Sequence, residues 1–430
     1  MPLVLQVAQH VRTTPMAVIQ EAGKKRILLV STHPNQTNGY SKVTYRILRH
    51  LGAKEDIELI NYGFQNFGHV DMQSRITNIP SSVTVYDAAR QEGPPSETRH
   101  GFGFAHFRDF LKLARPALVI IFNDPIVTTS FLLEMKKQPP VLGEGVKVIT
   151  YLDTVYAHQR PDLLALIESA SDHIIAFTEH WKEALRAQGV SKPMNTLMHG
   201  FDEADFPAPR APQVRKEGQM VVLNLNRNAQ RKRMDVTAMA IAEVFKRRPD
   251  ADIVFLIPEV TGAWDVPSII AQEMSGKFTP AEVARYQSER ILTVENRQKM
   301  TDSQVSDLYH MEDVGLSTAQ GEGVGLAQLE HAGIGRPQIV PSVGGLTEFL
   351  DRDCAMMIEP KAKMYVDKVV EPFGGRCEVV DYRDVADGIL FYYDNPEIRE
   401  QHGKLAAERI RERYAWPKLM DGLYETIRSV

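Results

Sequence analysis

The sequence predicts an α/β protein with two Rossmann-like domains. Short apolar runs alternate with helical patterns, a proline-rich segment interrupts this alternation near the middle of the chain, and the alternation then begins again. Continuous apolar strands separated by helices are typical of a parallel sheet that is covered on both faces. With 430 residues, the chain is long enough for two or three domains that each bury a substantial core.

The first domain is expected to span residues 25–205, after an N-terminal extension at 1–24. It begins with a buried-type strand at 26–31, followed by a polar segment that contains Gly39 and by a helix that ends near Leu51. Further strands are expected at 57–62, 83–86, 117–122, 146–152 and 173–177, with helices at 104–113, 127–136 and 181–187.

A linker is expected at 206–217, because three prolines stand within seven residues and proline-rich segments are semi-rigid. The second domain follows at 218–410, with strands expected at 220–225, 252–256, 291–294, 313–316 and 337–340. A C-terminal helix at 411–430, marked by Trp416, is expected to pack back toward the first domain. Ligands of open α/β sheets bind beyond the carboxyl ends of the strands, so the ligand is expected in the cleft between the domains.

Composition and charge exclude several classes of function. A net charge of −5 and a pI near 6.3 argue against nucleic acid as a partner, because broad nucleic-acid binding needs a basic field. The two cysteines, Cys354 and Cys377, form no disulfide framework or zinc pattern, so a reducing compartment such as the cytoplasm is expected. No apolar run approaches the roughly 18 residues of a membrane span, which leaves peripheral membrane contact as an open alternative.

Two glutamates, Glu322 and Glu330, carry the most informative pattern. Gly323 and Gly325 follow the first, and an apolar helical pattern surrounds the second. Eight residues rise roughly 12 Å along a helix, more than the about 5–9.5 Å between the paired carboxylates of glycosidases. The gap suits a ligand with hydroxyls at both ends and an anion between them, bound by backbone amides at a helix N-terminus. A nucleotide diphosphate-sugar has this layout, although such a spacing also occurs by chance on solvated helix faces.

A cationic segment follows the first strand of the second domain, with four cations between Arg227 and Arg233. Many charge runs are solvated loops, but this one lies at the carboxyl end of a strand, where the fold binds its ligand. Arg227 and Lys232 are expected to project onto a pyrophosphate, with arginine as a bidentate donor and lysine as a compact charge.

Taken in order, these motifs resemble the retaining GT-B glycosyltransferases, specifically glycosyltransferase family 4. The resemblance covers about residues 25–430, including the proline-rich linker and the aromatic-marked C-terminal helix. It rests on four motifs with matching spacing: Arg227-x4-Lys232, Glu322-x7-Glu330, Gly335-x-Pro337 and Gly344-Gly345-x-x-Glu348. The resemblance implies two domains that face each other across a cleft, with the donor bound by the second.

The roles of the donor residues are what this resemblance implies. Glu322 would contact hydroxyls of the transferred sugar, and Glu330 would bind the ribose of the nucleotide. The pyrophosphate would lie against the segment Gly323, Val324, Gly325 and Leu326.

Arg227 and Lys232 would neutralise the charge that develops on the departing diphosphate. Family members retain the anomeric configuration, with front-face attack assisted by a leaving phosphate oxygen. They need no divalent metal or other cofactor, and the sequence holds no Asp-x-Asp or His-rich cluster.

The first domain matches the family less closely. Gly39 stands in the loop after the first strand, where the family is usually richer in glycine. The family often has a His-Asp pair after the fifth strand, where this chain has Asp153, with His158 five residues later. Both are candidate catalytic residues, although a lone histidine such as His158 is more often structural. The acceptor, whether a carbohydrate, a lipid-linked molecule or a protein, stays open, as do the nucleobase and the sugar.

A GT-B epimerase, a GT-B phosphorylase and a non-catalytic nucleotide-sugar-binding protein are the alternatives within this fold. A GT-B phosphorylase would carry a pyridoxal-binding lysine, and the inverting-type epimerases lack this pair of glutamates at this spacing. A non-catalytic protein that binds nucleotide-sugars would keep the donor residues, and the divergent loop near Gly39 leaves that alternative open.

Overall fold

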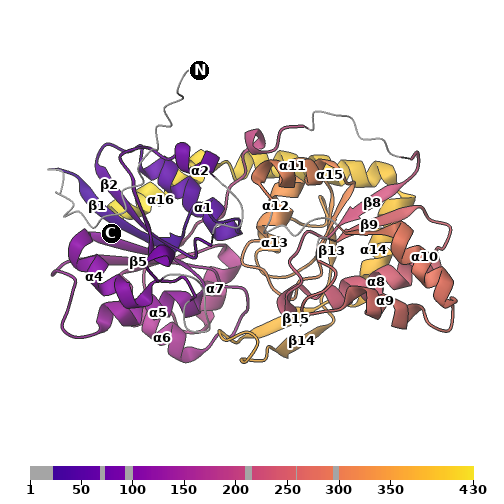
Figure 1. Ribbon diagram of the computed structural model, residues 1–430, viewed down its shortest axis with the longest axis horizontal. Coiled ribbons are helices and arrows are strands. Elements are labelled where there is room, and N and C mark those ends of the chain that lie inside the picture. Colours follow the sequence, from indigo (N-terminus) through magenta and orange to yellow (C-terminus); the bar gives the residue numbers. More distant parts are fainter. Residues whose placement is uncertain (1–22, 68–72, 93–99, 209–215, 258, 294–299) are drawn as a thin grey trace, which may run out of the picture.

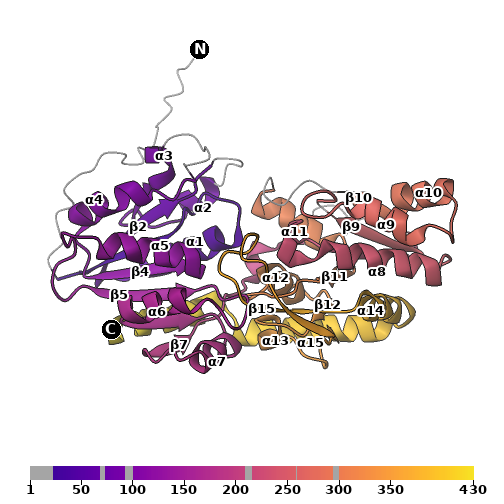
Figure 2. The ribbon, with the colours of Figure 1, turned by 90° about the horizontal axis from the view of Figure 1, so that it is seen from below.

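The computed structural model describes residues 23–67, 73–92, 100–208, 216–257, 259–293 and 300–430. They form two α/β domains side by side, each built on a parallel sheet, as the apolar alternation predicts (Figures 1 and 2). The N-terminal extension expected at 1–24 lies outside the described residues except for Gly23 and Lys24. Residues 209–215 of the expected linker also lie outside them.

The N-terminal sheet has seven parallel strands in the order β3-β2-β1-β4-β5-β6-β7. Its strands are β1 Lys25–Thr32, β2 Ile57–Phe64, β3 Thr84–Asp87, β4 Leu118–Asn123, β5 Lys147–Leu152, β6 His173–Ala176 and β7 Met194–Thr196. Its helices are α1 Gly39–Leu51, α2 Gln73–Thr77, α3 Ala88–Glu92, α4 Phe104–Ala114, α5 Pro125–Lys136, α6 Pro161–Ala170 and α7 Glu179–Ala187. The central strands β1, β4 and β5 are buried except for the first residues of β1 and β5, because helices cover both faces.

The C-terminal sheet has six parallel strands in the order β10-β9-β8-β11-β12-β13. Its strands are β8 Met220–Leu223, β9 Ile253–Ile257, β10 Ile291–Thr293, β11 Val314–Leu316, β12 Gln338–Pro341 and β13 Met356–Ile358. A short 3-10 turn, Gln230–Lys232, precedes the first of its helices. The helices are α8 Met234–Arg247, α9 Val266–Met274, α10 Pro280–Arg290, α11 Asp302–His310, α12 Leu326–Gly333, α13 Leu346–Phe349, α14 Tyr382–Asp394 and α15 Pro396–Arg413.

The sequence patterns missed three features of this architecture. Strands β7 and β13, of three residues each, were not predicted, although β10 and β11 of the same length were. An antiparallel hairpin of β14 Ala362–Tyr365 and β15 Arg376–Val379 also went unrecognised, because β14 is exposed along its length and has no apolar alternation. In Figure 1 this hairpin lies along the lower edge of the molecule, close to the boundary between the domains.

The linker was expected to lie outside the core, but its first residue is buried. Phe206 is buried and stacks on Phe201 with ring centroids 5.5 Å apart. Only the following residues, Pro207 and Ala208, are exposed before the segment that is not described. The aromatic side chain therefore anchors the start of the connection in the core, and its burial outweighs the polar and proline-rich character of its neighbours.

Helix α16, Trp416–Ser429, leaves the C-terminal domain and crosses to the N-terminal one, next to α1 (Figure 1). The crossing point is held by backbone pairing, because the Phe201 N–H donates to the Tyr414 carbonyl at 2.7 Å. Trp416 is buried there against Gly200, where a Cβ atom would come within 2.5 Å of its ring. The C-terminal helix thus ties the two domains together beside the start of the linker.

Replacing Trp416 with alanine should lower the free energy of unfolding by about 3–5 kcal/mol, because a large buried ring leaves a cavity that its neighbours fill poorly. Denaturant titration of the purified protein measures this change. Leu405→Ala, at an exposed site on α15, is the control and should change stability by less than about 0.5 kcal/mol. Equal effects of the two substitutions would contradict the role given to Trp416.

Candidate functional site

The loop between β11 and α12 carries Glu322, whose carboxylate is 3% exposed and held by two cations. Arg231 donates from Nη1 to Glu322 Oε2 at 2.8 Å and to the Gly321 carbonyl at 2.6 Å. Lys232 forms an ion pair with the other carboxylate oxygen, Oε1. A buried charge is tolerated only with such partners, so the cationic loop after β8 and the Glu322 loop are fixed against each other.

That Arg227 and Lys232 project onto a pyrophosphate stays a prediction. At Glu322 the structure places Lys232 together with Arg231, whereas Arg227 is exposed. The reason is the 3-10 turn at Gln230–Lys232, which directs two consecutive side chains toward the same carboxylate.

Burial and charge act in opposite directions on these groups. Burial by itself would raise the pKa of Glu322, but Lys232 and Arg231 outweigh it and lower the pKa of this carboxyl below its usual value. Burial lowers the pKa of Lys232 to about 8, and repulsion from Arg231 adds to burial against the attraction of Glu322. Lys232 is thus a cation that responds to pH in a range where most lysines do not.

The backbone at Glu322 and Gly323 is closely packed against a tryptophan of the N-terminal domain and a glycine pair of its own domain. Trp181, on α7 of the N-terminal domain, donates its indole N–H to the carbonyl oxygens of Glu322 at 3.1 Å and Gly323 at 2.9 Å. On the other side, Cβ atoms at Gly344 and Gly345 would meet the carbonyl oxygens of the same two residues. Side chains are therefore excluded from both faces of this segment, and its carbonyls are already engaged.

The N-terminus of α12 begins immediately after this segment. Gly325 adopts a left-handed conformation with φ 86° as the N-cap and carries no side chain that could cap the helix. The first N–H groups of a helix have no partner inside it and attract anions. Nearby, the buried Oε1 of Gln328 has no hydrogen-bond partner among the described residues. Val324, which precedes the cap, is buried, so the segment presents backbone rather than side chains.

Asp153 faces the same segment from the N-terminal domain, at the end of β5. Tyr40 donates its hydroxyl to Oδ2 of Asp153 at 2.5 Å, while the buried Oδ1 has no partner among the residues that the structure describes. A Cβ atom at Gly323 would collide with that oxygen, so Asp153 lies directly against the loop that carries Glu322. Burial raises the pKa of Asp153, although Tyr40 and Arg231 partly offset this effect.

The two remaining N-terminal candidates are placed differently. Gly39 is the first residue of α1, and a Cβ atom there would lie 3.5 Å from the side chain of Leu326 at the start of α12. The structure does not bring His158 into this site. Its side chain is exposed on a left-handed backbone with φ 53°, and nothing in the described part of the chain connects it with Glu322 by a hydrogen bond or ion pair.

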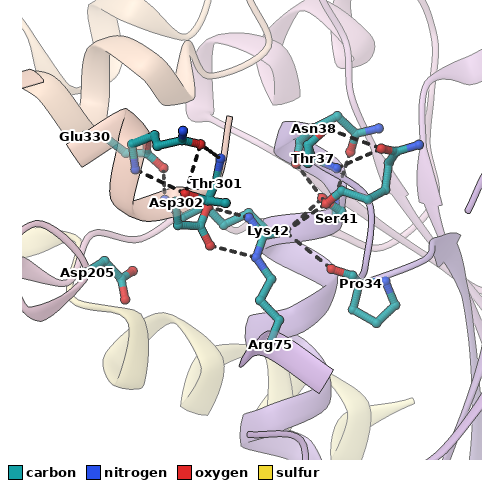
Figure 3. A network of polar contacts seen from close by, with 12 residues as sticks. Pro34, Thr37, Asn38, Ser41, Lys42, Arg75, Asp205, Thr301, Asp302 and Glu330 are labelled. Atoms are coloured by element: carbon teal, nitrogen blue, oxygen red, sulfur yellow. Dashed lines mark hydrogen bonds and ion pairs between the residues drawn. The ribbon is translucent and has the colours of Figure 1, made fainter. Parts of the chain in front are cut away.

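Glu330 is on α12 and is 1% exposed, deep between the domains. Lys42 of α1 pairs with Oε1 of Glu330 at 2.7 Å (Figure 3). Tyr309 donates its hydroxyl to Oε2 of the same carboxylate at 3.2 Å. Because α12 begins only at Leu326, the helical rise of roughly 12 Å between Glu322 and Glu330 does not apply. An uninterrupted helix from Glu322 to Glu330, on which that separation was based, does not form.

The hairpin of β14 and β15, with the loop between its strands, contacts the N-terminal domain. Arg160 donates from Nη1 to the Pro372 carbonyl at 3.1 Å, and the Arg376 N–H donates to the Ala157 carbonyl at 2.7 Å. The half-buried Glu371 lies within the electrostatic reach of Arg231, and burial raises its pKa. Burial likewise raises the pKa of Asp124, after β4, to about 6.

Sequence reasoning missed Tyr40, Lys42, Arg231 and Glu371. The cationic run contained a signal for Arg231. The other three meet partners far away along the chain, and Lys42 does so across the domain boundary. Among the described residues, no group of three or more His, Cys, Asp or Glu is arranged to hold a metal ion. No helix in the same part of the chain is both long and apolar enough to cross a membrane.

Comparison with protein families decides the class of enzyme. The model of a family described as family 4 glycosyltransferase in conflict systems matches residues 171–423, more than half of the chain. The chain belongs to this family of glycosyltransferases. The predicted family resemblance is thereby confirmed. Curated proteins gave no match to the chain.

Solved structures place this glycosyltransferase in the GT-B fold, as predicted. Anabaena Alr3699/HepE in complex with UDP and glucose superposes with a TM-score of 0.66 at 13% identity, over 94% of this chain and 100% of that one. Sucrose-phosphate synthase from Thermosynechococcus elongatus gives 0.67 at 14% identity, over 94% and 99%. A trehalose-6-phosphate synthase, studied for glycosyl transfer with retention, gives 0.63 at 11% identity, over 94% and 99%. At these identities the likeness concerns the fold alone.

Arg231→Met should lower the free energy of unfolding by about 1.5–3 kcal/mol, because it removes a charged hydrogen bond from a carboxylate that stays buried. Arg227→Met, at an exposed site in the same loop, is the matched control and should change it by less than about 0.5 kcal/mol. Denaturant midpoints at constant m-value measure both changes. A larger loss in the Arg227 variant would show that the cations are wrongly assigned.

Proposed function

We propose that this glycosyltransferase moves a sugar from a UDP-sugar to a hydroxyl acceptor with retention of configuration, without a divalent metal or other cofactor. The observation that carries the proposal is the Glu322 cluster. A buried carboxylate and two cations, Arg231 and Lys232, lie beside the uncapped N-terminus of α12 and face Asp153 across the domain boundary. Carboxylates, cations and free amides in one place suit sugar hydroxyls and a diphosphate together.

Each part of the donor has a partner in this proposal. Glu322 contacts hydroxyls of the sugar, the amides from Val324 to Leu326 hold the pyrophosphate, and Glu330 binds the ribose. The bond between the anomeric carbon and the diphosphate breaks, and Arg231 and Lys232 stabilise the charge on the departing phosphate oxygens. The acceptor hydroxyl attacks from the same face and gives its proton to a leaving phosphate oxygen, which leaves no need for a separate general base.

The choice of UDP and of retention follows the GT-B structures. HepE was solved with UDP and glucose, and retention is the subject of the trehalose-6-phosphate synthase study. Metal independence is carried over from the family resemblance, and in this chain Arg231 and Lys232 would supply the positive charge.

The acceptor side is proposed to lie between Asp153, Asp124 and the hairpin loop with Glu371. These carboxyl groups can accept hydrogen bonds from acceptor hydroxyls. The acceptor itself is a carbohydrate, a lipid-linked molecule or a protein. Both cysteines are buried and free, which fits the proposed cytoplasmic location, with peripheral membrane contact if the acceptor is a lipid.

The proposal is tested by a thermal-shift screen with UDP-, GDP- and ADP-sugars, followed by an assay for release of the nucleoside diphosphate. UDP-sugars should raise the melting temperature and be turned over, because a ligand that binds only the folded state stabilises it. Glu322→Gln should reduce turnover at least 100-fold, about 3 kcal/mol in the barrier, while UDP binding is retained. Binding without turnover of any donor would favour the non-catalytic alternative, and unchanged turnover in Glu322→Gln would contradict the role of Glu322.

Binding of UDP should weaken as the pH rises through about 8, the pKa of Lys232 in the free protein. The ammonium is present below this pKa and attracts the diphosphate, whereas the neutral amine above it does not. Calorimetric titrations between about pH 7 and pH 9.5 measure the affinity. Lys232→Arg should keep it constant over this range, because arginine stays charged; a parallel decline in both proteins would assign the titration to another group.

A further inference from the structure

Lys42 is an unusual residue for the interior of a protein. It is 7% exposed, and its ammonium reaches across the domain boundary to Glu330 at 2.7 Å. The same ammonium lies 4.6 Å from the centre of the Phe206 ring. Lysine is rarely buried unless its charge is paired, so Glu330 is what keeps this cation in place. Figure 3 shows Lys42 pointing from α1 toward Glu330 on α12.

The two helices that carry this pair begin at nearly the same point. Gly39 at the start of α1 lies against Leu326 at the start of α12. Lys42 is three residues into α1 and Glu330 is four residues into α12, which places both about 5–6 Å, one helical turn, beyond the starts of their helices. The start of α12 is where the proposed function puts the diphosphate. Lys42, with its flexible four-carbon stem, therefore has this position within reach.

We propose that Lys42 is a donor-binding residue contributed by the N-terminal domain. Resting on the proposed function, this assignment gives Lys42 two partners in turn. In the free enzyme Glu330 holds the ammonium; when the ribose occupies Glu330, the ammonium turns to the diphosphate one helical turn away. The ammonium thus compensates the negative charge of Glu330 in the free enzyme and that of the diphosphate in the complex. The donor site then contains residues of both domains.

A neighbouring ion pair shows what a purely structural contact between the domains looks like. Arg75 of α2 binds Asp302 of α11 with two hydrogen bonds of 2.8 and 2.6 Å. The same guanidinium also donates to the carbonyls of Pro34 and Gln36 and to the hydroxyl of Ser41 (Figure 3). Because the N–H groups of Arg75 are bound to several partners at once, the guanidinium cannot turn to a ligand. The lysine, with a single pivoting ammonium, can exchange its partner.

The test compares the affinities of UDP and uridine, which differ only in the diphosphate, by calorimetry. If the screen above selects GDP or ADP, that nucleotide and its nucleoside replace them. Lys42→Met should weaken UDP binding at least tenfold and leave uridine binding within about twofold, since the change removes a phosphate partner. Lys42→Arg should retain most of the preference for UDP. Arg75→Met, the control that breaks the neighbouring pair, should change both affinities by the same factor.

A second comparison guards against simple destabilisation of the buried carboxylate. In Glu330→Gln the carboxylate charge is gone, and adding Lys42→Met to it should still reduce the ratio of UDP to uridine affinity about tenfold. An unchanged ratio in either background, or equal losses for both ligands, would overturn the proposal and leave Lys42 as a structural contact. If wild-type protein binds none of the three nucleoside diphosphates, the proposed function itself fails.

Discussion

The structure depends on the compensation of one buried carboxylate, that of Glu322. Taking a carboxylate out of water costs several kcal/mol, which only close partners can offset. Arg231 and Lys232 supply them and thereby join the loop after β8 to the loop after β11. Trp181 of the other domain then binds the carbonyls of the same segment. A single electrostatic requirement therefore sets the geometry of the Glu322 loop, to which the N-terminal domain adds its own contact.

The second constraint is that the backbone around Glu322 packs too closely for side chains at three glycines, Gly323, Gly344 and Gly345. The segment that follows Glu322 meets Asp153 on one side and the turn at Gly344 and Gly345 on the other, with no space for Cβ atoms. Backbone amides can approach a ligand only where side chains do not intervene, so the same glycines that permit the close contact also leave the start of α12 open. Packing and binding are thus two results of one local arrangement.

The fold was readable from the sequence because strands buried on both faces leave continuous apolar runs. The expected ranges 57–62 and 117–122 correspond to β2 and β4 with small shifts at their ends. Short or exposed strands, such as β7 and the β14–β15 hairpin, leave no such signal. In the site, the cationic segment was recognised, but the pairing of Arg231 and Lys232 with Glu322 was not, because a 3-10 turn cannot be recognised from charge spacing.

By itself, the sequence determined the fold class, the family motifs, and the segment in which Glu322 and Glu330 stand. Those properties depend on local order along the chain: apolar periodicity, glycines and charge. Only the tertiary structure decided the partners of these glutamates. Arg231 is 91 residues from Glu322 along the chain, and Lys42 is 288 residues from Glu330. The first pair forms where two loops of one sheet meet, and the second where helices of the two domains meet. In both places burial requires each charge to find a counter-charge, and no local pattern encodes which one it finds.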